Sequence, residues 1–166
     1  DVLFIKKEGE FHNKISNEIN KNGFIYQQQL SFQERNFVLQ YISEQKNKNK
    51  NYKVIDIGGS VNGWSHNVID FIVDINPPQN NDNNKIHFFQ YNINFVSEWE
   101  KEILQYVKEN GKFDFCICSH TLEDITMPIV VIQMMEQISK EGYVAIPSKY
   151  VELAKIEGEY LGYIHH

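Results

Sequence analysis

Strand-like and helix-like segments alternate along the chain from residue 52 onward, and this alternation limits the possible fold more than any other feature. The strand-like segments are YKVIDI (52–57), FIVDI (71–75), IHFFQY (86–91), KFDFCICS (112–119) and YVAIP (143–147). Strands separated by helices or long loops generally pair in parallel, with helices covering both faces of the sheet. The sequence therefore predicts an α/β fold with a doubly wound, mostly parallel sheet of Rossmann-like type.

The first fifty residues differ in pattern and are expected to form an N-terminal helical segment or lid. Apolar residues recur every four positions from residue 11, which predicts a thin amphipathic helix over 11–23. Ser31 and Glu34 have the spacing of a capping box, so a second helix is expected to begin at Ser31. The run KNKNKN at 46–51 is interpreted as a solvated linker. The predicted division is 1–50 for this segment and 51–166 for the α/β domain.

Helix signals also occur between the later strands. Ser97 and Glu100 form a second capping-box pattern, and Gly111 is expected to end the helix that begins there. Pro128 fits the first turn of the next helix, where a missing N–H does no harm, and Gly142 is expected to end that helix.

Composition and charge exclude several classes of protein. The net charge is −6, and the one basic run alternates with Asn, so nucleic-acid binding is only a minor alternative. No apolar run approaches the ~20 residues of a membrane helix, and the first residues lack a signal-peptide pattern. Cys116 and Cys118 are the only cysteines and face the same side of a predicted strand, so buried, reduced thiols are expected rather than a metal site. These features predict a cytoplasmic protein, which could be one domain of a larger chain because no Met begins it.

Small and polar residues follow the predicted strands at the points where ligands bind in doubly wound folds. Gly58 and Gly59 leave room for a ligand to reach backbone N–H groups, or for a neighbouring helix to pack closely. Asp74 can accept hydrogen bonds from ribose hydroxyls, although a helix cap is the simpler role for a lone acid. Asn92 can contact a purine edge or form an Asn turn. The stretch GGSVNG has Ser60 where the dinucleotide fingerprint needs Gly, which weakens a nicotinamide hypothesis.

Together, VIDIGGS, IVDIN, YNIN, FDFCICSHTLEDI and ISKEGYVAIPS resemble the class I S-adenosylmethionine-dependent methyltransferases over about residues 52 to 148. The most specific piece is SHTLEDITMP, which is similar to the segment S-H-x-L-E-H/D-I-x-x-P of small-molecule methyltransferases. GYIHH is similar to a stretch in members found with glycan-modifying genes. Family members normally add two strands after the fifth, the last of them antiparallel, so the resemblance implies a domain that lacks these strands or is truncated.

The resemblance implies a cofactor, S-adenosylmethionine, and a role for each matching residue. The implied cofactor-binding residues are Asp56, Gly58, Gly59, Ser60, Asp74, Ile75, Asn92, Ile93, Ser119 and His120. Within this set the first four would hold the methionine end and Asp74 the ribose. Asn92 stands where many members have an Asp that contacts the adenine amine. Ser119 and His120 would lie beside the sulfonium and the acceptor.

Three functional hypotheses follow. The first is methyl transfer to a small-molecule or glycan acceptor, with His120 as a candidate catalytic base because imidazole titrates near neutrality. The alternative role for His120 is to shape the pocket. The second hypothesis is a catalytically silent methyltransferase-like domain that acts as a partner or scaffold. The third is a Rossmann domain that binds nicotinamide or a nucleotide sugar. In the first case residues 1–45 are expected to cover the cofactor cleft as a lid.

Overall fold

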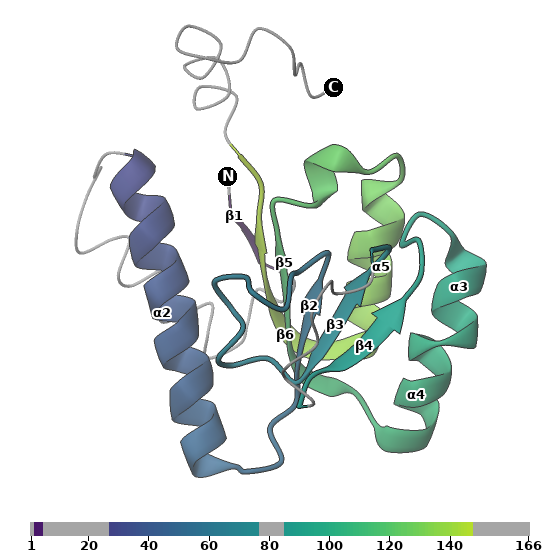
Figure 1. Ribbon diagram of the computed structural model, residues 1–166, viewed down its shortest axis with the longest axis horizontal. Coiled ribbons are helices and arrows are strands. Elements are labelled where there is room, and N and C mark those ends of the chain that lie inside the picture. The colour runs from purple at the N-terminus through teal and green to yellow at the C-terminus, as the bar shows by residue number, and fades with distance from the viewer. Residues whose placement is uncertain (1, 5–26, 77–84, 148–166) are drawn as a thin grey trace, which may run out of the picture.

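A computed structural model describes residues 2–4, 27–76 and 85–147 (Figure 1). Its centre is one six-stranded sheet, whose strands lie in the order β1 (Val2–Phe4), β6 (Ser139–Ala145), β5 (Phe113–Ser119), β2 (Val54–Ile57), β3 (Phe71–Asp74) and β4 (His87–Gln90). The five strands β2 to β6 are parallel. The predicted α/β fold with a doubly wound, mostly parallel sheet is therefore confirmed.

The strand β1 was not predicted, because the start of the chain was expected to be helical. It pairs antiparallel with β6, with Val2 opposite Ala145 and Phe4 opposite Tyr143. An antiparallel strand from the beginning of the chain thus covers this edge of the parallel sheet. The predicted helix over 11–23 lies outside the described residues.

Helices cover both faces of the sheet, as Figure 1 shows. The helix α2 (Gln27–Lys48) lies on one face, where its residues Val38, Tyr41 and Ile42 are buried against the sheet. The helices α3 (Val96–Lys101), α4 (Ile103–Asn110) and α5 (Pro128–Ile138) lie on the other face. Successive side chains of β5 point to opposite faces of the sheet, so this strand contributes to the hydrophobic core on both faces. Cys116 and Cys118 face α5, while Phe115 and Ile117 face α2.

Both capping-box predictions were wrong. Ser31 lies inside α2, which begins four residues earlier at Gln27 because a run of glutamines followed by Leu continues a helix readily. Ser97 lies inside α3, which begins at Val96 after Phe95, and no side chain caps it. The helical stretch is also interrupted at Glu102, between α3 and α4. Gly111 ends α4 with φ of 78°, as expected.

The end of α5 also differs from the prediction. Pro128 is in the first turn, as expected, but the helix ends at Ile138 and Gly142 lies within β6. Ser139 makes this abrupt change possible. Its hydroxyl donates a hydrogen bond of 2.7 Å to the carbonyl of Met135, while its own backbone is already extended. The helix therefore passes into the strand without a loop.

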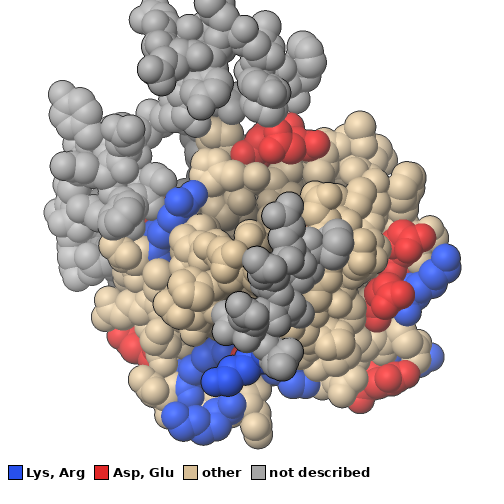
Figure 2. All heavy atoms as spheres, in the orientation of Figure 1, with Lys and Arg blue, Asp and Glu red and all other residues tan. Residues whose placement is uncertain are grey.

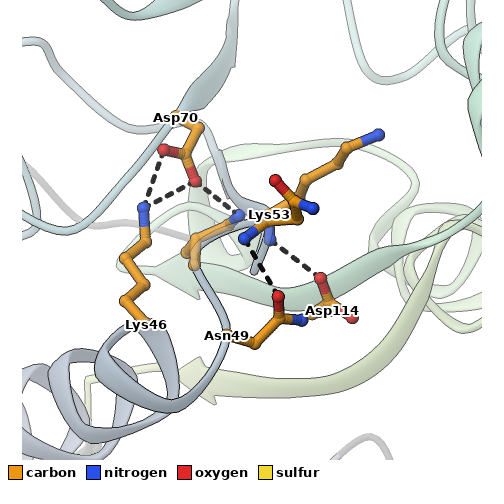
Figure 3. Close-up of polar contacts among 7 residues, drawn as sticks. Lys46, Asn49, Lys53, Asp70 and Asp114 are labelled. Atoms are coloured by element: carbon orange, nitrogen blue, oxygen red, sulfur yellow. Dashed lines mark hydrogen bonds and ion pairs between the residues drawn. The ribbon is translucent and has the colours of Figure 1, made fainter.

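The basic run around residues 46–51 is an anchor as well as a solvated turn. In Figure 2 basic side chains gather at the lower left, where α2 ends. Lys46 Nζ lies 2.7 Å from both oxygens of Asp70, and the same carboxylate accepts the backbone N–H of Val54 at 2.9 Å (Figure 3). Asp114 accepts the backbone N–H of Lys53 at 2.8 Å. These contacts fasten the end of α2 to the amino-terminal edge of the sheet.

None of the helices in the described part of the chain has the length and apolar character needed to cross a membrane.

Candidate functional site

The strand order creates one switch point, between β2 and β5. From β2 the chain adds β3 and β4 on one side, and then it crosses to add β5 and β6 on the other side. In doubly wound sheets, ligands commonly bind beyond the carboxyl ends of the strands near such a switch point. The predicted site residues lie at or beyond the carboxyl ends of β2, β3, β4 and β5, except Asp56, which lies within β2.

The turn after β2 packs directly against the loop after β5. Gly58 has φ of 72°, which favours glycine, and its N–H donates a 2.7 Å hydrogen bond to the carbonyl of Val73. A Cβ at Gly58 would lie 2.4 Å from Cγ2 of Thr121. The Thr121 hydroxyl in turn donates to the carbonyl of Ile57 at 3.3 Å. Glycine is therefore required here both by its backbone conformation and by the close approach of the two loops.

Gly59 leaves space for a buried carboxylate. A Cβ at Gly59 would lie 2.3 Å from Cγ of Asp56, whose side chain is only 4% exposed. The hydroxyl of Ser65 donates a 2.5 Å hydrogen bond to Asp56 Oδ2. Burial raises the pKa of Asp56 to about 6; the Ser65 hydrogen bond opposes this shift and the charge of Asp74 adds to it. Asp56 thus supports the glycine turn from below.

Residues 58–70, all of them described, form consecutive turns without an α-helix. The N–H of Gly63 donates to the carbonyl of Ser60 at 2.8 Å, and the N–H of Val68 donates to the carbonyl of Ser65 at 2.9 Å. Dinucleotide-binding folds place the pyrophosphate at the N-terminus of a helix that follows the first strand. That helix is missing from this segment.

A cleft of about 360 Å³ opens beside the glycine turn and extends over the ends of β3 and β4. This volume lies within the roughly 300–1,000 Å³ of small-molecule sites. The described residues that line it are Gly58, Val73, Asp74, Ile75, Asn76, Tyr91, Asn92, Ile93, Asn94, His120, Thr121, Asp124 and Ile125. Apolar walls therefore alternate with carboxylate, amide and imidazole groups.

Six of the predicted site residues line this cleft: Gly58, Asp74, Ile75, Asn92, Ile93 and His120. The other four do not. Asp56 is buried beneath Gly59, which is partly exposed, and Ser60 is exposed. Ser119 is the last residue of β5, and its hydroxyl oxygen is buried without a hydrogen-bond partner among the described residues.

Asp74 ends β3 and lines the cleft. Its Oδ1 accepts the backbone N–H of Asn76 at 2.7 Å, which fixes the carboxylate in place. Ile75, which follows it, is 53% exposed although it is a large apolar residue. Such a carboxylate can accept hydrogen bonds from the hydroxyls of a ribose. An exposed apolar side chain beside it can contact the flat face of the attached base.

His120 lies on the opposite side of the cleft from Asn92, just after β5. It has φ of 55°, a strained value for a residue other than glycine, and its N–H donates to the carbonyl of Ala145 at 2.8 Å. Its Nδ1 lies 3.4 Å from Oε1 of Glu123, and its side chain is 42% exposed. The strained backbone directs an imidazole that is paired with a carboxylate toward the cleft.

Asn94, which was not predicted as a site residue, joins the two sides of the cleft. Asn94 Oδ1 accepts hydrogen bonds from the backbone N–H and the hydroxyl of Thr126, both at 2.9 Å, and from the N–H of Met127 at 3.1 Å. These bonds attach the loop after β4 to the residues just before α5. Thr121, Asp124 and Ile125 were also missed as lining residues, because their segment was interpreted only through its resemblance to a motif.

The described lining of the cleft is acidic. Its described lining contains Asp74 and Asp124 but neither Lys nor Arg. Figure 2 shows acidic side chains at the upper end of the molecule, toward which β5 and β6 run. Among the described residues, no group of three or more His, Cys, Asp or Glu side chains is arranged to hold a metal ion.

Comparison of the chain with protein-family models, curated proteins and solved structures finds no match.

Proposed function

We propose that this protein binds S-adenosylmethionine in the cleft and transfers its methyl group to a small-molecule or glycan acceptor. The observation that carries the proposal is a fixed carboxylate, Asp74, in the wall of a nucleoside-sized cleft whose described lining has neither Lys nor Arg. The proposed compartment is the cytoplasm.

Charge favours a sulfonium nucleoside over a dinucleotide. A pyrophosphate is usually held by Lys, Arg or a helix N-terminus. The described lining contains neither Lys nor Arg, and no α-helix begins in it; Thr121 precedes only the three-residue 3₁₀-helix Leu122–Asp124. Asp74 and Asp124 would repel a diphosphate, whereas they would attract a cation. A nicotinamide cofactor or a nucleotide sugar therefore fits this cleft less well than S-adenosylmethionine does.

The shape of the cleft also fits the parts of this cofactor. Gly58 lies in the lining and has no side chain, so the amino-acid end would lie against its backbone. Asp74 would bind the ribose hydroxyls, and Ile75 and Ile93 would contact the faces of the base. When bound, S-adenosylmethionine supplies an electrophilic methyl group on a cationic sulfur.

His120 would serve the acceptor. Its imidazole, held beside Glu123, can take the proton that an acceptor hydroxyl loses as its oxygen bonds to the methyl carbon. The carboxylate would stabilise the resulting imidazolium. Holding the acceptor and methyl group in line would supply most of the rate enhancement, an effect worth up to about 7–11 kcal/mol in well-oriented systems.

Thermal-shift measurements with S-adenosylhomocysteine, NAD and a nucleotide sugar test the proposal, because a ligand that binds the native state raises the unfolding midpoint. We expect S-adenosylhomocysteine alone to raise it, by roughly 5–10 °C at one hundred times its dissociation constant. Asp74→Ala should abolish this shift. Glu100→Ala, which removes an exposed carboxylate on α3, should leave it intact.

Two other outcomes would contradict the proposal. A shift with NAD or the nucleotide sugar alone would indicate a nucleotide-binding Rossmann domain. No shift with any of the three ligands would favour a silent domain that acts as a partner or scaffold.

A further inference from the structure

The helix α2 contacts the turns that follow β2, and it does so through one aromatic side chain. Trp64 lies in these turns, and the guanidinium of Arg35 on α2 lies over its indole ring, 5.4 Å from the ring centroid. This distance falls within the roughly 6 Å of a cation–π contact. In Figure 1 the chain between β2 and β3 correspondingly bends toward α2. Arg35 therefore joins the helix to residues 58–70.

A second residue of α2 holds the same side chain from the sheet. Tyr143 of β6 is 1% exposed, and its ring meets the ring of Trp64 edge to face, with the centroids 6.2 Å apart and an interplanar angle of 83°. The Tyr143 hydroxyl donates a hydrogen bond to the carboxylate of Glu34, which directly precedes Arg35. Two consecutive residues of α2 therefore hold Trp64, Arg35 directly and Glu34 through Tyr143.

Trp64 is connected to the cleft through the residue that follows it. Ser65 is fully buried, and its hydroxyl donates to Asp56, whose carboxylate lies beneath Gly59. Gly58, which precedes Gly59, lines the cleft. A displacement of Trp64 would draw Ser65 away from Asp56 and would leave the glycine turn without this support. The wall of the cleft at Gly58 thus depends on a contact made by α2, although no described residue of α2 belongs to that wall.

We infer that Arg35 and Trp64 are positioning residues, through which α2 fixes the conformation of residues 58–70 and the shape of the cleft at Gly58. Neither side chain is part of the described lining, so neither acts by touching a ligand. The effect on ligand affinity rests on the proposed function, whereas the effect on residues 58–70 does not. Because coupling between two sites is reciprocal, a ligand at Gly58 would in turn hold α2 more firmly.

Amide hydrogen exchange measured by NMR tests the positioning without a ligand. The amides of Gly63 and Val68 donate to carbonyls within the turns, so their exchange reports local opening there. Trp64→Leu keeps an apolar side chain but loses both ring contacts, so it should speed this exchange by about tenfold relative to the amide of Ile117 in β5. Trp64→Phe keeps a ring for both partners and should speed it by less than about threefold. Arg35→Gln removes only the cation and should speed it by about threefold.

The matched control is Tyr41→Phe, which weakens the attachment of α2 at a different point. It removes the 2.6 Å hydrogen bond from the Tyr41 hydroxyl to Glu141 and leaves the contacts of Trp64 in place. It should not change the exchange of the turn amides relative to that of β5. The inference is overturned if Trp64→Leu leaves this ratio unchanged, or if Tyr41→Phe raises it as much as Trp64→Leu does.

Isothermal titration calorimetry with S-adenosylhomocysteine tests the consequence for the cleft. Trp64→Leu should raise the dissociation constant by about tenfold and Trp64→Phe by less than about threefold, while Tyr41→Phe should leave it unchanged. Faster exchange in the turns of Trp64→Leu with an unchanged dissociation constant would overturn the link between α2 and the cleft. Absence of binding to the wild-type protein would refute the proposed function alone, since the exchange rates still decide whether α2 positions residues 58–70.

Discussion

Asp56 shows how one residue type can serve a role that its position in the sequence does not reveal. It lies at the third position of β2, two residues before the glycine turn, where a cofactor contact was predicted. Its side chain instead lies under Gly59 and accepts the hydroxyl of Ser65. Sequence analysis identified a residue essential to the turn, but the direction of its side chain depends on the fold of residues 58–70.

The raised pKa of Asp56 gives a pH-dependent stability. Its pKa rises from 3.8 to about 6 in the native protein, so the folded state keeps a proton that the unfolded chain releases near pH 4. The protonated Asp56 carboxyl therefore contributes its full stabilisation of the folded state below about pH 4, and this stabilisation is lost as the pH rises through 6. Asp56→Asn, which retains an acceptor for Ser65, should remove this loss.

Urea unfolding between pH 4 and 7 measures this effect. The free energy of unfolding of Asp56→Asn minus that of the wild-type protein should increase by about 2–3 kcal/mol across the range. Glu100→Gln provides an exposed control that should show no such trend. A pH-independent difference for Asp56→Asn would show that Asp56 titrates normally in the native protein.

At the scale of elements, strands were easier to predict than helix ends. All five parallel strands were predicted because long apolar runs are typical of a sheet that is buried on both faces. Helix starts were wrong at Ser31 and Ser97, since local capping patterns occur by chance and lose to the packing of residues such as Trp99. The extended backbone of Gly142 depends on pairing with Cys116 in β5, which no local pattern indicates.

The two described glycines with positive φ offer a matched test of the turn after β2. Gly58→Ala and Gly111→Ala both place Ala at a φ that suits glycine, with φ of 72° and 78°. Only at Gly58 would the new Cβ collide, since nothing lies within 4 Å of that position at Gly111. Gly58→Ala should therefore destabilise the protein by about 1–3 kcal/mol more than Gly111→Ala.

Urea unfolding of the two variants, with calorimetry of S-adenosylhomocysteine binding, provides the measurement. Gly58→Ala should also weaken ligand binding, whereas Gly111→Ala, at the far end of α4, should not. Equal losses of stability and affinity would mean that the contact between the β2 and β5 loops does not shape the site.

At the scale of the whole molecule, the sheet protects both thiols. Cys116 and Cys118 are fully buried in β5, which pairs with β2 on one side and β6 on the other. Burial raises the pKa of Cys116 to about 12 and that of Cys118 well above its usual range. Both thiols are therefore protonated and inaccessible while the sheet is intact.

Thiol labelling in native buffer at pH 8 should consequently proceed at the rate of global unfolding. If the proposed function is right, S-adenosylhomocysteine should slow this labelling, because a ligand that binds only the native state stabilises it. Labelling at the rate of a free thiol would contradict the position of β5 at the centre of the sheet.

Topology was enough to predict which residues lie near one another. Parallel strands bring their carboxyl ends to one edge, so Gly58, Asp74 and Asn92 were expected together and are together. The contributions of Asn94 and Thr121 could not be predicted, because they depend on which loops touch. The predicted lid over the cleft concerns residues that lie largely outside the described range, and residues 34–48 of α2 pack on the sheet face without lining the cleft.

A crystal structure of the protein with S-adenosylhomocysteine would test the central claim most directly. The ribose hydroxyls should lie within hydrogen-bonding distance of Asp74, with the base between Ile75 and Ile93. A ligand bound elsewhere on the molecule, or one whose ribose does not reach Asp74, would contradict the claim.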